Sequence, residues 1–159
     1  IMSKNIRIIV LVFVIGFLLV SCGYKKIAQE KLSISLQNIN ITADKRIAYK
    51  LKNNILLISN EESKNKYNLD LNLIYKKTSK IIDKTGKTTR FNIAYTGNLK
   101  LKNIDSDENI NKSFNVNGEY NIAEDYSDTI NNRNTAINNI IEKLSNDITN
   151  FITLSFRTK

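Results

Sequence analysis

The sequence predicts an α+β domain in which a four-stranded, mostly antiparallel sheet carries two helices packed on one face. Apolar and polar residues alternate over three long segments between residues 66 and 122, as is typical of half-buried strands. Another alternating segment lies nearer the N-terminus, and two segments repeat their apolar residues every three to four positions, as amphipathic helices do. The predicted order is strand, helix, three strands, helix. Two helices on one face of the sheet would bury every apolar stripe at once.

The first strand is expected over residues 32–41, where leucine and isoleucine alternate with polar residues. The alternation shifts phase near Asn38, which predicts an interruption there. The next segment has helical spacing, so we expect a helix over about 43–57 with Thr42 as its N-cap. Because a helix follows the first strand, this strand should join the sheet through a crossover connection. The sequence does not specify which strand pairs with it.

The three long strands should pair as a meander. Residues 83–86 predict the first turn, with Gly86 suited to positive φ, and residues 103–109 predict the second. A final helix is expected over about 127–152, and the residues after 153 are expected to fray. The apolar positions of the strands are Tyr67, Leu69, Leu71, Leu73 and Tyr75, then Phe91, Ile93, Tyr95, Leu99 and Leu101, then Phe114, Val116, Tyr120 and Ile122.

The opposite side of these strands is polar but nearly uncharged. Asparagine amides both donate and accept hydrogen bonds, so such a face suits contact with a polar wall. An ordinary solvated sheet face is the alternative interpretation. The residues concerned are Asn68, Asp70, Asn72, Asn92, Thr96, Asn98, Asn115, Asn117, Glu119 and Asn121.

The N-terminal segment, residues 1–21, has the pattern of a secretory signal peptide: a basic start, an apolar run and small residues at the cleavage point. Cys22 follows directly, and the pattern resembles a bacterial lipoprotein signal, in which this cysteine is acylated and begins the mature chain. The apolar run is too short for a transmembrane anchor, which needs about 20 residues. We therefore expect lipid on Cys22, a lipid-anchored tether over 22–31 and a single domain over 32–159.

Composition narrows the possible functions. The chain contains no histidine and one cysteine, which excludes Ser-His-Asp and Cys-His catalysis and ordinary zinc sites. We therefore expect that the protein is not an enzyme and has no catalytic residues. We also expect no metal site and no cofactor apart from the N-terminal lipid. The net charge of +9 at pH 7 comes without an aromatic-rich or arginine-rich stretch, which favours an anionic membrane surface over nucleic acid. A coding sequence rich in A and T would explain the lysines equally well.

Six cations surround the first turn of the meander, with Asp83 as the one acid among them. Several cationic side chains on one projecting turn could hold the phosphates of an anionic lipid. The alternative is a set of edge lysines that prevent strand-to-strand association. The six cations are Lys76, Lys77, Lys80, Lys84, Lys87 and Arg90.

This order of elements behind the sequence Cys22-Gly23-Tyr24 resembles the LptE family of lipopolysaccharide-assembly lipoproteins. Segments 46–51, 84–88 and 135–144 also fit the resemblance. It implies an outer-membrane lipoprotein on the periplasmic side, which plugs and helps to assemble the LptD β-barrel. It also implies a part in inserting lipopolysaccharide into the outer leaflet. The absence of an aspartate after Cys22 agrees with export to the outer membrane.

The resemblance also implies a site. A basic residue in the turn between the second and third strands is associated with lipid binding in the family, and it corresponds to Lys84, with Lys87 and Arg90 beside it. A second basic position after the last strand is not reproduced, because Glu124 and Asp125 stand there. The alternative function is an independent periplasm-facing lipoprotein that binds a small apolar ligand or the cell wall, which would need a cavity between helices and sheet.

Overall fold

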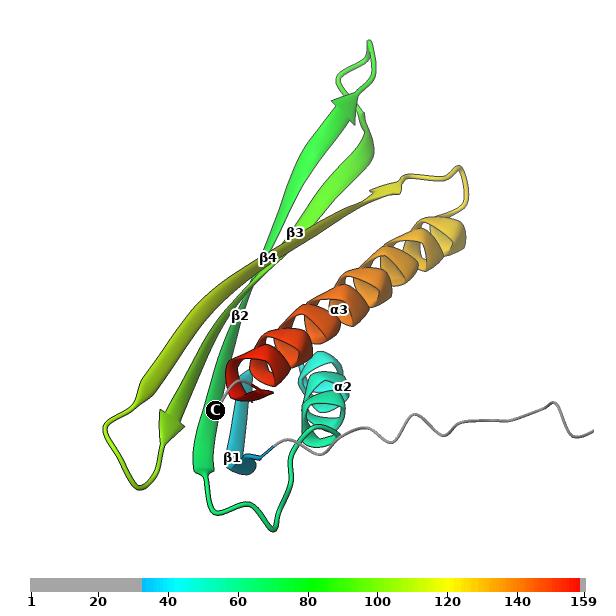
Figure 1. Cartoon of the computed structure of the whole chain (residues 1–159). Helices are drawn as coiled ribbons and strands as arrows, with labels where there is room; N and C mark the ends of the chain where they lie inside the picture. The colour runs from blue at the N-terminus through cyan, green and yellow to red at the C-terminus, as the bar shows by residue number, and fades with distance from the viewer. Residues whose placement is uncertain (1–32, 158–159) are drawn as a thin grey trace, which may run out of the picture.

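The computed structural model describes residues 33–157, so the predicted signal peptide, the tether and Cys22 lie outside the described residues. Both helices lie on one side of the sheet, with α3 running diagonally along it and α2 beside α3 (Figure 1). The predicted α+β class, the order of elements and the two layers are confirmed. The elements are β1 (Ser35–Thr42), α2 (Lys45–Leu56), β2 (Lys66–Ile82), β3 (Thr88–Asn103), β4 (Asn109–Asn121) and α3 (Tyr126–Arg157).

The strands lie in the order β1-β2-β3-β4. β1 runs parallel to β2, and the other two pairs are antiparallel. The predicted crossover is confirmed, and it joins β1 to β2 through α2. The register of β1 shifts between Leu36 and Asn38, where the sequence predicts an interruption.

The start of α2 differs from the prediction. The N-cap is Asp44, whose Oδ1 accepts a hydrogen bond from the backbone N–H of Arg46 at 3.0 Å. Thr42 is not the cap, because it is still paired with Asn72 at the end of β1. The strand therefore ends one residue later than the alternation predicts, and the cap moves to Asp44.

The end of α3 also differs. The predicted fraying after residue 153 is wrong, since the helix continues to Arg157. Ile152 is fully buried and Phe156 is 5% exposed, so the apolar stripe of the helix continues for another turn. Burial of these two side chains stabilises the last turn, which local sequence spacing alone would not hold.

A single core fills the space between the sheet and the helices. It contains the inward residues of the strands, Leu51 and Ile55 of α2, and the apolar stripe of α3. The two helices also contact each other through a polar bond, in which Asn54 Nδ2 donates to the buried Ser145 Oγ at 3.0 Å. Among residues 33–157, no helix combines the length and the apolar character needed to cross a membrane.

The hairpin formed by β2 and β3 extends well beyond the helices (Figure 1). β1 pairs with β2 only over residues 66–72, so the outer half of β2 is bonded on one side alone. The ten polar residues predicted to face away from the helices are all exposed or half-buried. The outer hairpin and this polar face are therefore the parts of the sheet that are open to contact with other molecules.

Candidate functional site

The turn between β2 and β3 is organised by Asp83. Its Oδ1 accepts hydrogen bonds from the Thr85 N–H at 2.8 Å, the Thr85 hydroxyl at 2.6 Å and the Lys87 N–H at 3.0 Å. These bonds, that of the Thr85 hydroxyl above all, hold the pKa of Asp83 below its ordinary value. Gly86 has φ of +85°, as the sequence predicts for this turn. The carboxylate of Asp83, the one acid of the turn, thus stabilises the conformation of the turn through these hydrogen bonds.

Lys84 and Lys87 stand exposed on this turn. Neither ammonium forms an ion pair or a hydrogen bond within residues 33–157, although the charge of Lys87 acts weakly on Asp83. The backbone of the turn is held in place while its two lysine side chains remain available. These two predicted site residues therefore lie together at the tip, ready to meet an external anion.

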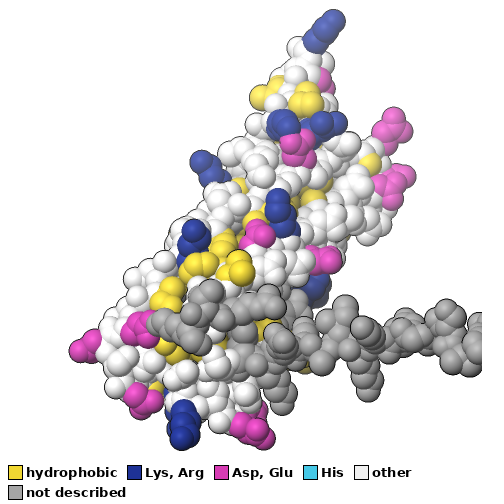
Figure 2. All heavy atoms as spheres, viewed as in Figure 1, with side chains coloured by type: hydrophobic (Ala, Val, Ile, Leu, Met, Phe, Trp, Pro, Cys, Tyr) yellow, Lys and Arg dark blue, Asp and Glu magenta, His cyan; other side chains and the backbone are white. Residues whose placement is uncertain are grey.

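Apolar side chains accompany the two lysines. Ile81 and Ile82, which end β2, are 43% and 58% exposed. Figure 2 shows hydrophobic side chains next to Lys and Arg side chains on the projecting hairpin. A surface that combines cations with exposed apolar groups suits the boundary between charged headgroups and acyl chains.

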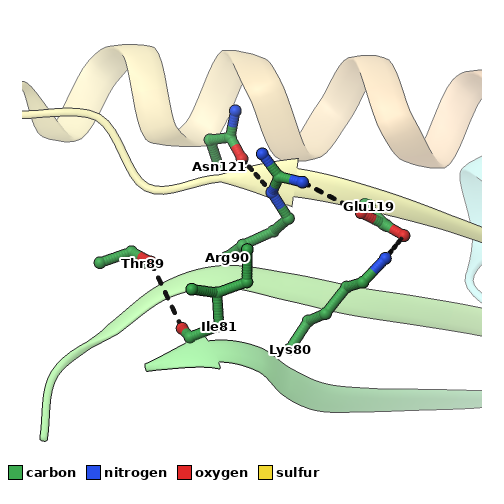
Figure 3. A network of polar contacts seen from close by, with 6 residues as sticks. All are labelled: Lys80, Ile81, Thr89, Arg90, Glu119 and Asn121. Carbon is green, nitrogen blue, oxygen red and sulfur yellow. Dashed lines mark hydrogen bonds and ion pairs between the residues drawn. The ribbon is translucent and has the colours of Figure 1, made fainter. Parts of the chain in front are cut away.

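Arg90, the third predicted site residue, has partners on β4 (Figure 3). Its Nε donates to Asn121 Oδ1 at 2.6 Å, and its Nη1 lies 3.6 Å from Glu119 Oε2. Lys80 is hydrogen-bonded to the other oxygen of the same Glu119. The hydrogen bond from Lys80, followed by the charges of Lys80 and Arg90, lowers the pKa of Glu119. Arg90 thus links the projecting part of the hairpin to the end of β4. Its part in lipid binding stays a prediction.

The remaining cations of the cluster lie on the free edge of β2. Lys76, Lys77 and Lys80 follow the point where β1 ends, so they line a strand edge that has no neighbour within residues 33–157. Charged side chains on such an edge discourage pairing with another chain. The strand positions of these three lysines agree with the edge-protection interpretation, although the ammonium of Lys80 is itself bound to Glu119 of β4. The lipid-binding prediction concerns the two lysines at the tip.

Lys77 makes a contact that the sequence pattern did not predict. The ammonium of Lys77 lies 3.7 Å from the centroid of the Phe91 ring and 5.7 Å from that of Tyr120. This cation–π contact places the ammonium against the apolar face of the sheet at Phe91 and Tyr120. The alternation of β2 carries the signal, because it places Lys77 on the same face as the apolar positions.

Among residues 33–157, no group of three or more His, Cys, Asp or Glu side chains gathers where it could hold a metal ion. The acids at Glu119 and Asp83 are instead occupied by cations and turn amides.

No protein-family model and no curated protein sequence matches the chain. Solved structures do match it. Rare lipoprotein B from Shewanella oneidensis aligns with a TM-score of 0.58 and 8% identity, over 75% of this chain and 96% of that one. The chain therefore shares its fold with a protein named as a lipoprotein.

Two further structures show the same likeness. Lipoprotein B from Nitrosomonas europaea aligns with a TM-score of 0.55 and 12% identity, over 76% of this chain and 84% of that one. A protein from Caulobacter crescentus, also described as a lipoprotein, aligns with a TM-score of 0.53 and 13% identity, over 80% of this chain and 92% of that one. Since most of each neighbour is covered, the likeness extends over a whole domain. At these identities it concerns the fold.

Proposed function

We propose that this protein is a lipid-anchored lipoprotein on the periplasmic side of the outer membrane. It plugs and helps to assemble an LptD-type β-barrel and takes part in inserting lipopolysaccharide into the outer leaflet. Its role is binding and positioning, with no enzymatic step and no cofactor beyond the lipid on Cys22. The fold shared with three proteins named as lipoproteins supports the first part of this proposal, and the LptE resemblance supports the second.

The hairpin tip is the observation that carries the lipid-handling role. Lys84 and Lys87 present two ammonium groups without ion pairs among the described residues, next to the exposed Ile81 and Ile82. Lipid A has phosphates at the edge of an acyl layer, so one surface of this kind can contact both parts of it. A Lys or Arg near an anionic lipid surface contributes about 1 kcal/mol. Arg90 adds a third cation at the base of the hairpin.

The polar face of the sheet supports the plug role. It carries uncharged side chains such as Asn72, Asn98 and Asn117, all exposed. Contact between these amides and a hydrated barrel wall would bury few charges, and buried charges are costly unless they are paired. The length of the hairpin also allows the tip to reach lipid beyond the body of the domain (Figure 1).

Charge reversal at the tip tests the lipid-handling role. We expect the Lys84→Glu/Lys87→Glu variant of the full chain to retain about tenfold less lipid A in a pull-down, because two attractive charges become repulsive. Lys100→Glu/Lys102→Glu is the matched control, since it changes the net charge equally on exposed positions of β3 away from the tip. Equal retention by both variants and the unaltered protein would remove the tip from the lipid site.

Gentle extraction tests the plug role. The full chain should co-purify in mild detergent with a large outer-membrane barrel of about 80 kDa, a size that large barrel architectures permit. Recovery of the protein as a monomer alone, under conditions that keep other barrel complexes intact, would contradict the proposed partnership.

A further inference from the structure

A second feature with ligand-binding character lies away from the hairpin tip. It is an open groove of about 710 Å³ between the start of α2, the middle of β3 and the first half of α3. Small-molecule sites typically enclose about 300–1,000 Å³. The groove is therefore large enough for one small ligand.

The rim of the groove is cationic. Lys45, Arg46 and Lys50 of α2 and Arg133 of α3 line it, and none of them forms an ion pair with residues 33–157. Asp44 is the one acid in the described lining. Its carboxylate already accepts the N-cap hydrogen bond from the Arg46 N–H. The four cations therefore outnumber the acid, and the groove complements an anion.

Tyr95 supplies a neutral donor on the wall. Its side chain is 7% exposed, yet its hydroxyl makes no hydrogen bond to any of residues 33–157. Burial, and next the neighbouring Tyr75, raise the pKa of Tyr95, so the hydroxyl keeps its proton at neutral pH. The charges of Arg133 and Asp44 both act on this group, which agrees with its position in the groove. Among residues 33–157, no side-chain polar atom is both buried and without a hydrogen bond, so the Tyr95 hydroxyl is open to solvent although its residue is mostly buried. It can therefore donate to a ligand in the groove.

The floor of the groove is apolar. Ile141 is 1% exposed, and Ile47 and Ile137 are half-buried at the contact of the two helices. Covering them with methylene groups would remove apolar surface from water, which favours binding. A small ion without an apolar part would leave these isoleucine side chains in contact with water.

We propose that the groove binds an anionic amphiphile, with an acyl chain on the isoleucine floor, a phosphate or carboxylate against Arg46, Lys50 and Arg133, and the Tyr95 hydroxyl as a donor. The tether of the chain itself is a poor occupant, because residues 22–31 carry three lysines and one glutamate. The site is separate from the hairpin tip and does not depend on the function proposed above.

Photo-labelling of the full chain in dodecyl maltoside tests this proposal. The probes are dodecyl phosphate, dodecanoic acid and neutral dodecanol, each with a diazirine in the alkyl chain, and the labelled peptides are mapped by mass spectrometry. We expect the anionic probes to label residues 45–50 and 133–141 at least fivefold more than dodecanol does. A stronger signal from the phosphate or from the carboxylate identifies the preferred headgroup. Equal labelling by dodecanol would overturn the proposal.

Variants separate the groove from the rest of the surface. Arg46→Glu/Arg133→Glu should reduce labelling at least tenfold, and Asn138→Trp should reduce it similarly by filling the groove without changing charge. All three positions are exposed on helices, and circular dichroism checks that the fold is kept. Lys84→Glu/Lys87→Glu is the control and should leave groove labelling unchanged. Labelling that falls with this hairpin control, or persists in both groove variants, would place the amphiphile elsewhere.

Discussion

The ring of Phe156 meets the ring of Tyr67 edge-on, with the centroids 4.9 Å apart and an angle of 63° between the ring planes. Phe156 lies in the last turn of α3, and Tyr67 lies near the start of β2. The Tyr67 hydroxyl also donates to Glu108 Oε2 at 2.8 Å, just before β4. One aromatic contact thus fastens the end of the long helix to the sheet.

Truncation of Phe156 should therefore be costly. We expect Phe156→Ala to lower the free energy of unfolding by about 3–5 kcal/mol, because a buried ring is lost and a cavity remains. Leu154→Ala, at a position that is 65% exposed on the same turn, should change it by less than about 0.5 kcal/mol. Urea denaturation measures both. Similar values for the two variants would show that the last turn does not pack as described.

Gly118 allows α3 to lie close to β4. A Cβ at this position would lie 3.0 Å from Ile140 Cδ1 and 3.1 Å from its Cγ1. We expect Gly118→Val to destabilise the protein by about 1–3 kcal/mol through overpacking. Combination with Ile140→Ala should cost less than the sum of the two single changes, because each relieves the other. Additive losses in thermal unfolding would exclude this direct contact.

Glu119 should restrain the base of the projecting hairpin. Glu119→Gln removes the carboxylate that Lys80 and Arg90 share, so we expect lower backbone order parameters for residues 80–90 by ¹⁵N relaxation. Glu142→Gln is a control with the same chemical change on an exposed position of α3. Unchanged order parameters in the Glu119 variant would mean that strand pairing alone holds the hairpin.

Arg90 should matter less to lipid binding than the two tip lysines. Its charge is already offset by Glu119, and its Nε is committed to Asn121. We therefore expect Arg90→Gln to reduce lipid A retention by a few-fold at most, against about tenfold for the double lysine variant. Lipid A pull-downs on both variants make the comparison. A larger loss for Arg90→Gln would reverse this ranking.

The Asp83 turn should respond to acid. The folded-state pKa of Asp83 lies below its ordinary value of 3.8, so its stabilising contribution is present above that pH. This contribution is lost as the pH falls through the lowered folded-state pKa. A carboxyl ¹³C titration should give a midpoint below 3.8, with the amide shifts of Thr85 and Lys87 moving at the same pH. Asp83→Asn should abolish that common transition.

Some features of the candidate site could be predicted from neighbouring residues in the sequence, and others could not. The turn of Asp83 and Gly86 could be predicted, because hydrogen bonds between neighbouring residues determine it. The sequence identifies the cations around this turn, but it does not show which of them form ion pairs and which do not. Only the pairing of β3 with β4 brings Glu119 opposite Asn92 and within reach of Arg90. The groove could not be found at all, since its residues come from three elements that are far apart in the chain.

The sequence by itself determined the class and order of the elements, because periods of two and of about 3.6 residues are properties of each segment alone. It also determined the position of the break near Asn38, where the alternation changes phase. The tertiary structure decided that β1 pairs with β2, that α3 continues to Arg157, and which cations remain unpaired among residues 33–157. Each of these depends on contacts between residues distant in the chain, and the free energy of such contacts appears only when the segments pack together.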